Sequence, residues 1–147
     1  MARTIVQLPH PIHNPKSSDA RKLWASRSAP SAGFEHVLLA AVPEEINRAL
    51  HEWELDFIEE HLPKSPFRFL DVGCGYGRLA GEVAARRPDS AVFGCDGAEW
   101  LLRKAMGIAG RCVVADLTAL PFRSGSMDVV LAAHALIQRR RDGVRGA

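Results

Sequence analysis

The chain has 147 residues, of which 47% are hydrophobic and 24% charged, and its formal net charge is +2. This composition is that of an ordinary soluble domain, and the length is enough for one domain but not for two. No apolar run approaches the length of a transmembrane helix, and the N-terminus has no signal-peptide core. We therefore expect a cytoplasmic protein without a membrane partner.

Residues 1–33 are rich in arginine and serine and almost free of acidic residues. This composition is similar to that of a transit peptide, but Pro9, Pro11 and Pro15 would interrupt the amphipathic helix that such a peptide needs. We expect a flexible N-terminal arm over residues 1–33, or a cover of the substrate site that becomes ordered only with ligand. The folded domain is expected to span residues 34–138.

A helix is expected over residues 43–61. Pro43 suits its first position, and the two glutamates that follow complement the positive end of the helix dipole. Apolar residues fall on one face at helical spacing: Ile46, Ala49, Leu50, Trp53, Phe57 and Ile58. We expect this face to pack on the sheet, with Trp53 in the core and His51 in solvent.

A loop with three glycines at alternate positions connects an apolar run to the start of an amphipathic helix. It reads Asp71-Val72-Gly73-Cys74-Gly75-Tyr76-Gly77. Because glycine has no Cβ, the chain can turn tightly there and a ligand can approach the backbone. The free N–H groups at the start of the helix would point at the same place. We expect Asp71, Gly73, Cys74 and Gly75 to contact a cofactor, with Cys74 contributing its backbone.

The spacing of these glycines separates the loop from two phosphate-binding forms. A dinucleotide-binding loop, G-x-G-x-x-G, would need its third glycine at position 78, which is Arg78. A Walker loop would need a lysine before serine or threonine, and none follows. The loop therefore has the form Asp-x-Gly-x-Gly-x-Gly. Taken alone, it is also compatible with a purely structural turn before a helix.

Short apolar strands are expected after the glycine loop at residues 91–96, 111–116 and 129–133. A helix with leucine, valine and alanine on its inner side separates the strand before the loop from the first of these. This strand–helix–strand unit predicts an α/β fold with a parallel sheet and a right-handed crossover. The first two of the later strands end on carboxylates, Asp96 and Asp116.

Asp96 comes 25 residues after Asp71, at the end of a predicted strand and before Gly97. A carboxylate at the tip of the second strand can accept hydrogen bonds from both hydroxyls of a ribose. The alternative is a helix N-cap, because aspartate caps well and Leu101 and Leu102 follow. The two roles compete for the same oxygens. We expect the ribose role, with Gly97 also contacting the cofactor.

The glycine loop, Asp96 and Asp116 together resemble the cofactor site of the class I S-adenosylmethionine-dependent methyltransferases. The resemblance covers residues 67–138. The segment 120–122, Leu-Pro-Phe, and the segment 126–130 match a further run of the same subfamily, with Met127 in place of the usual aromatic residue. That subfamily is similar to the small-molecule methyltransferases of ubiquinone and menaquinone biosynthesis.

The resemblance implies a Rossmann-like, doubly wound parallel sheet that binds S-adenosylmethionine between its first and fourth strands. There Asp71, Gly73 and Gly75 would meet Ala133, because ligands of open parallel sheets bind where the strand order reverses. In the family, the residue that matches Asp116 accepts a hydrogen bond from the adenine amine. The next backbone N–H, here that of Leu117, faces the ring.

A complete family member is similar to a seven-stranded sheet in the order 3-2-1-4-5-7-6, whereas this sequence supplies only the N-terminal four strands. We therefore expect a domain truncated after the fourth strand, which would become an exposed edge with unpaired backbone groups. Such an edge predicts a weakly stable protein or a homodimer through the fourth strand. The missing strands normally supply much of the acceptor pocket.

Residues 139–147 carry four arginines and have no helix or strand period. One interpretation is a phosphate-binding tail with nucleic acid as the partner. The other is a solvated, disordered basic tail. The absence of interleaved aromatic residues favours the disordered tail and argues against nucleic acid.

The three cysteines, Cys74, Cys95 and Cys112, show no C-x-x-C spacing and cannot all pair. Each lies in or beside a predicted strand, as buried thiols do in reducing compartments. The histidines give no metal pattern, because His51 lacks the partner that a zinc-protease helix would place at position 55. We expect no metal ion and no cysteine nucleophile.

Methyl transfer from a sulfonium mainly requires alignment of the nucleophile and exclusion of water. A general base is needed only for acceptors such as a hydroxyl, and His134 is the one candidate near the right place, so the catalytic residues stay unassigned. The Asn-Pro-Pro-Tyr run of DNA and protein-glutamine methyltransferases is absent, because residues 133–136 read Ala-His-Ala-Leu. By resemblance, this leaves a small-molecule acceptor of the quinone or natural-product type.

Three hypotheses follow from the sequence. The first is an S-adenosylmethionine-dependent methyltransferase, which a homodimer completing the sheet would support. The second is a truncated, non-catalytic remnant that at most binds the cofactor. The third is a nicotinamide-dependent oxidoreductase, which Asp116 and the replacement of a third glycine by Arg78 disfavour.

Overall fold

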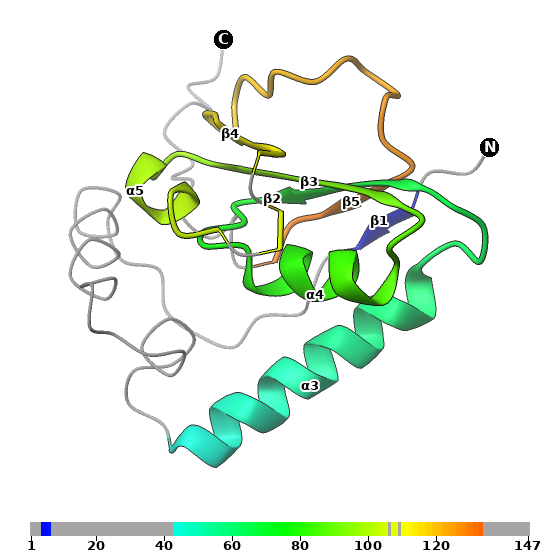
Figure 1. Ribbon diagram of the computed structural model, residues 1–147, viewed down its shortest axis with the longest axis vertical. Coiled ribbons are helices and arrows are strands. Elements are labelled where there is room, and N and C mark those ends of the chain that lie inside the picture. The colour runs from blue at the N-terminus through cyan, green and yellow to red at the C-terminus, as the bar shows by residue number, and fades with distance from the viewer. Residues whose placement is uncertain (1–3, 7–42, 106, 109, 134–147) are drawn as a thin grey trace, which may run out of the picture.

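The computed structural model describes residues 4–6, 43–105, 107–108 and 110–133 (Figure 1). In chain order the described elements are β1 (Thr4–Val6), α3 (Glu44–His61), β2 (Arg68–Val72), α4 (Arg78–Arg86), β3 (Ala91–Asp96), α5 (Glu99–Leu102), β4 (Cys112–Val114) and β5 (Val129–Leu131). Within these residues, no helix combines the length and the hydropathy that crossing a bilayer requires.

The strands form one parallel sheet in the order β1-β5-β2-β3-β4. β2 lies at its centre, where Leu70 is paired with Phe93 of β3 and Val130 of β5. The crossover from β2 to β3 runs through α4, as a strand–helix–strand unit requires. The predicted α/β parallel sheet is confirmed, with the four predicted strands in the order β4-β3-β2-β5.

The two faces of the sheet are covered differently. On one face, Phe69, Val92 and Val129 are fully buried in a core that also contains side chains of α3 and α4. Figure 1 shows both helices on that side of the sheet. On the other face, Leu70 and Cys95 pack with apolar side chains of the connection between β4 and β5. Strand β2 is therefore buried on both faces from Phe69 to Val72, and Asp71 is the one charged residue in this buried stretch.

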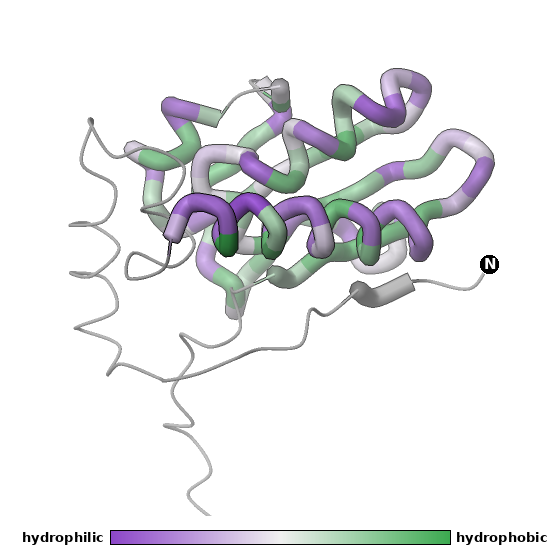
Figure 2. The backbone as a smooth tube through the Cα atoms, turned by 90° about the horizontal axis from the view of Figure 1, so that it is seen from below, coloured by the Kyte–Doolittle hydropathy of each residue, from purple (hydrophilic) through white to green (hydrophobic). Residues whose placement is uncertain are grey.

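The predicted inner face of α3 is wrong in part. Ile58 is buried as expected, but Ile46 is 51% exposed and Trp53 is 45% exposed. Asn47 and Glu54 are buried instead. Figure 2 shows hydrophilic and hydrophobic residues alternating along this helix, which crosses in front of the sheet. The apolar period misplaced the inner face because two polar residues occupy it, and polar residues are buried where they have partners.

The predicted exposed edge at the fourth strand is also wrong. β1 pairs in parallel with β5, with Thr4 opposite Val129 and Val6 opposite Leu131. Three residues of the predicted N-terminal arm thus add a fifth strand to the described sheet, and the argument for a homodimer through β5 no longer applies. The remainder of residues 1–33 and the tail 139–147 lie outside the described residues, so the proposed domain boundaries stay a prediction.

Candidate functional site

The loop after β2 is a tight turn built on three left-handed glycines. Gly73, Gly75 and Gly77 have φ values of 79°, 55° and 81°. Residues with a Cβ are strained in this region, so the alternate spacing follows from the backbone. The N–H groups of Gly73 and Cys74 donate to the carbonyl of Cys95 at 2.8 and 3.1 Å, which fastens the loop to the end of β3.

Asp96 joins the glycine loop to the turn before α5. Its Oδ2 accepts the N–H of Gly75 at 2.9 Å, and its Oδ1 accepts the N–H of Ala98 at 2.8 Å. The second bond closes a turn before α5, whose N-cap residue is Ala98 and which has no capping side chain. A carboxylate has about four acceptor positions, and these two bonds use half of them. The remaining positions suit the hydroxyl donors of a ribose, and that role stays a prediction.

Asp71 supports the loop from beneath. Its side chain is buried, and its carboxylate accepts the backbone N–H of Ala80 in the first turn of α4. Burial is the main cause that raises the pKa of Asp71 to about 7; Arg78 and the N–H bond oppose this shift, and Asp96 adds to it. α4 has no capping side chain at Gly77. Asp71 therefore acts as a distant cap that holds the start of α4 against β2.

The other predicted site residues lie at the same edge of the sheet. The carbonyl of Asp96 accepts the N–H of Ala115, which brings the ends of β3 and β4 together. Asp116 is exposed and its Oδ1 accepts both the N–H and the hydroxyl of Thr118 at 2.8 Å. Leu117 is partly buried on the sheet.

Two small residues complete this edge. Gly97 is exposed, and a Cβ added there would lie 3.8 Å from the carbonyl oxygen of Ala115. Ala133 is buried just beyond β5, whose Leu131 is paired with Asp71. The structure therefore brings all nine predicted cofactor residues to the carboxyl ends of β2, β3, β4 and β5.

Cys74 turns its thiol into the protein. Burial raises the pKa of this thiol well above its ordinary value. A Cβ added to Gly94 would come within 2.6 Å of Cys74 Sγ, so the thiol packs directly on the glycine backbone. A buried thiol is a poor nucleophile, because the thiolate is the reactive form. Because the thiol points inward, Cys74 can contact a ligand only through its backbone.

Sequence reasoning missed a polar cluster beneath the loop. Arg78, the first residue of α4, lies 2.6 Å from Glu54 Oε2 through Nη2, and its Nη1 lies 2.6 Å from His51 Nδ1. His51 is half-buried, which corrects its expected place in solvent. The available signal was an arginine directly after the glycine loop.

The contact with Arg78 also determines the protonation state of His51. Arginine can only donate, so Nδ1 of His51 is the acceptor. Burial and the adjacent Arg78 lower the pKa of His51, which agrees with a neutral ring. Over the described part of the chain, no group of three or more His, Cys, Asp and Glu side chains is placed to hold a metal ion. His134, the candidate base, lies outside the described residues.

Residues 69–145 match the model of the methyltransferase domain family. The chain belongs to the class I S-adenosylmethionine-dependent methyltransferases, as the glycine loop and the acidic strand ends predicted.

Curated relatives agree with this assignment. The chain is 31% identical over 134 residues to the malonyl-[acyl-carrier protein] O-methyltransferase of Methylococcus capsulatus, an alignment that covers 85% of this chain and 46% of that protein. It is 36% identical over 87 residues to the demethylmenaquinone methyltransferase of Thermus thermophilus, covering 55% of this chain and 40% of that protein. The chain thus spans less than half the length of these two relatives.

Solved structures give more distant matches. One is the plantazolicin methyltransferase BpumL in complex with a pentazolic desmethylPZN analog and SAH, with 20% identity and a TM-score of 0.49 over 78% of this chain and 41% of that chain. Another is a TehB-like SAM-dependent methyltransferase from Corynebacterium glutamicum, with 23% identity and a TM-score of 0.47 over 80% of this chain and 54% of that chain.

Proposed function

We propose that this chain binds S-adenosylmethionine at the carboxyl edge of its sheet and serves methyl transfer to a small-molecule acceptor. The observation that carries the proposal is the hydrogen bond between Gly75 N–H and the Asp96 carboxylate. This bond unites the glycine loop with the acidic end of the next strand. The two predicted motifs are therefore in direct contact.

Each part of the cofactor has a proposed partner. The backbone of Gly73, Cys74 and Gly75 faces its amino-acid portion, where the nearest atom to a Cβ added at Gly75 is Leu101 Cδ1 at 3.8 Å. Asp96 and Gly97 take the ribose. This assignment fits the donor set, because both ribose hydroxyls donate and Asp96 keeps acceptor capacity.

The adenine end is assigned to the next strand. Asp116 takes the exocyclic amine, and the N–H of Leu117 faces the ring. Ala133 closes the site beside the glycine loop, and Asp71 acts from beneath by holding α4. Asp116 is exposed at the carboxyl end of the sheet, where its Oδ1 accepts the N–H and the hydroxyl of Thr118.

Methyl transfer requires little acid–base catalysis from the protein. The cofactor supplies an electrophilic methyl group on a sulfonium. The chain's contribution is to fix the cofactor in one orientation and to exclude water from the reacting face. A base is required only if the acceptor must lose a proton before attack.

The acceptor is proposed to be a small molecule. The curated relatives named above act on demethylmenaquinone or on a malonyl group carried by a protein. The alternative is a chain that binds the cofactor without catalysis, because it spans less than half the length of these relatives. A nicotinamide cofactor is disfavoured by Arg78 in place of a third glycine. A cytoplasmic location stays a prediction.

Calorimetric titration with S-adenosylhomocysteine tests the proposal. We expect micromolar binding that Asp96→Ala weakens by about 30-fold or more, equal to at least about 2 kcal/mol. Asp128→Ala is the matched control, because Asp128 is an aspartate that binds Arg68 at the opposite edge of the sheet. NADH should not compete. A folded protein that does not bind S-adenosylhomocysteine would overturn the proposal.

A further inference from the structure

The first residue of α4 carries a guanidinium that is almost inaccessible to solvent. The side chain of Arg78 is 9% exposed, and that of its partner Glu54 is 1% exposed. This pair joins α3 to the residue that directly follows the last glycine of the loop. The three alternate glycines have no side chains of their own to hold the loop, so its conformation depends on such neighbours.

The same guanidinium also acts on Asp71. Arg78 stabilises the charged form of the Asp71 carboxylate, whereas Glu54 and Asp96 oppose it. Arg78 therefore stabilises the charge of two buried carboxylates, Glu54 by direct contact and Asp71 by its electrostatic field. Without the arginine, an uncompensated carboxylate would be left in the interior, which costs more than the pair itself contributes.

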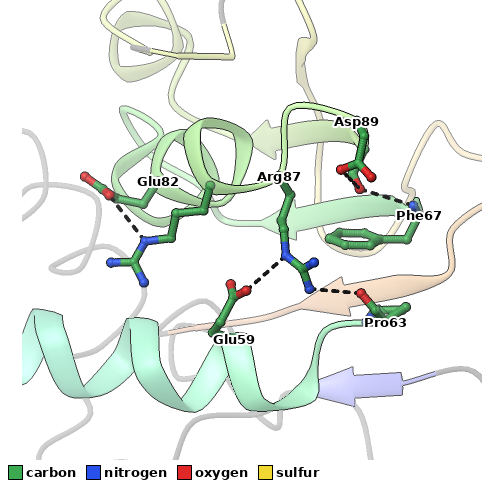
Figure 3. Close-up of polar contacts among 8 residues, drawn as sticks. Glu59, Pro63, Phe67, Glu82, Arg87 and Asp89 are labelled. Carbon is green, nitrogen blue, oxygen red and sulfur yellow. Dashed lines mark hydrogen bonds and ion pairs between the residues drawn. The ribbon is translucent and has the colours of Figure 1, made fainter. Parts of the chain in front are cut away.

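The opposite end of α4 has a second arginine–glutamate pair for comparison. Arg87 Nε lies 3.0 Å from Glu59 Oε1, and its Nη2 donates to the carbonyl of Pro63 at 3.0 Å (Figure 3). Its guanidinium also lies 5.7 Å from the centre of the Phe67 ring. This pair is more exposed, 22% for Arg87 and 40% for Glu59. Packing of α4 on α3 is thus already fixed at the end remote from the loop.

We propose that Glu54 and Arg78 are positioning residues that hold the glycine loop in its ligand-binding form, so that α3 controls the affinity for S-adenosylmethionine. The proposal rests on the proposed function of the loop. Arg78 fixes the start of α4 from α3 while Asp71 fixes it from β2. The loop between these two anchors is then held in one backbone conformation.

Affinity and stability must be measured separately to test this role. Titration with S-adenosylhomocysteine is performed on Arg78→Met, Arg78→Lys and Glu54→Gln at a temperature where each variant is folded. Arg87→Met removes the other pair. Val83→Ala removes buried apolar packing of the same helix without touching either pair.

We expect Arg78→Met to raise the Kd about tenfold or more, as misplaced ligand contacts do. Arg78→Lys should recover part of the affinity because it keeps the charge, and Glu54→Gln should lie between wild type and Arg78→Met. Arg87→Met and Val83→Ala should stay within about twofold of wild type. Equal changes in Kd for Arg78→Met and Val83→Ala would overturn the positioning role.

Amide hydrogen exchange separates this proposal from the proposed function. Arg78→Met should speed exchange at residues 73–77, and Arg87→Met should not. If wild type binds no S-adenosylhomocysteine but this contrast holds, the proposed function fails and the positioning of the loop stands. If both variants leave exchange at residues 73–77 unchanged, the positioning role is wrong whatever the wild-type affinity.

Discussion

The two ends of α4 are both attached to α3 through an arginine and a glutamate, yet the surroundings of the two pairs differ. Arg78 and Glu54 are buried beneath the glycine loop, whereas Arg87 and Glu59 are partly exposed beside Pro63. The attraction within a buried ion pair does little more than offset the cost of desolvating both charges, but removing one member strongly destabilises the protein. An exposed pair contributes little either way. Burial of charge at one end therefore fixes geometry where a ligand is proposed to bind.

The largest expected effect is on the stability of Arg78→Met. We expect its free energy of unfolding to fall by about 3 kcal/mol, because Glu54 and Asp71 lose their shared cation. Urea denaturation monitored by circular dichroism measures this change. A Glu54→Leu, Arg78→Met double variant should recover part of the loss, since it removes one orphaned carboxylate. If Arg78→Met were as stable as wild type, the buried pair would contribute no more to stability than the exposed pair at the other end of α4.

The buried carboxylate at the loop end also predicts a pH dependence. The pKa of Asp71 rises from 3.8 to about 7 on folding. Between these values the folded protein holds a proton that the unfolded chain releases, so rising pH favours unfolding. We expect the free energy of unfolding to fall by about 2.5 kcal/mol from about pH 5 to pH 8, because the contribution of Asp71 is lost as pH rises through about 7.

Asp71→Asn is the control for that dependence. Asparagine keeps an acceptor for the Ala80 N–H and does not titrate, so its stability should change less over the same pH range. Thermal unfolding at several pH values provides the measurement. A pH slope that is equal in the variant and in wild type would assign the titration to another group.

Close packing at the loop end gives a further prediction. A Cβ at Gly94 would lie 2.6 Å from Cys74 Sγ and 3.0 Å from Ile108 Cδ1. We expect Gly94→Ala to destabilise the protein by about 1–2 kcal/mol through overpacking. Adding Cys74→Ala should relieve part of this cost, because it removes the closest atom. Two additive losses in the double variant would show that the contact is not the cause.

The smallest effect is expected at the far end of α4. Arg87→Met should lower the free energy of unfolding by about 1 kcal/mol or less, as a partly exposed pair permits. Glu82→Gln, which removes the exposed partner of Arg86, should change it still less. Both can be measured beside Arg78→Met in one denaturant series. A loss at Arg87 as large as that at Arg78 would make the two ends equivalent.

Local chemistry made much of the site predictable from the sequence. The glycine loop could be recognised because three left-handed positions require glycine. Asp96 and Asp116 could be recognised because each carboxylate follows a short apolar strand. The buried face of α3 was not predictable by the same means. Glu54 finds its partner Arg78 only in the folded protein, and a hydrophobic period counts such a residue as exposed.

Long-range pairing limited the prediction in a second way. Asp71 was expected to contact a cofactor, and its bond to Ala80 follows only once α4 packs on β2. The strand at Thr4–Val6 consists of three β-branched residues, which favour a strand, but it is short and prolines follow it, so the sequence did not identify its sheet partner. Its pairing with β5 depends on the whole sheet.

That pairing has a consequence for the order of folding. Thr4 and Val129 are partners 125 residues apart in the chain, whereas Arg68 and Ala91, which align β2 with β3, are 23 apart. Closing the longer loop costs about 1.5 kcal/mol more in chain entropy. On the ribosome β1 emerges long before β5 and must wait for it. The glycine loop and its anchors can therefore be assembled while the outermost strand is still undocked.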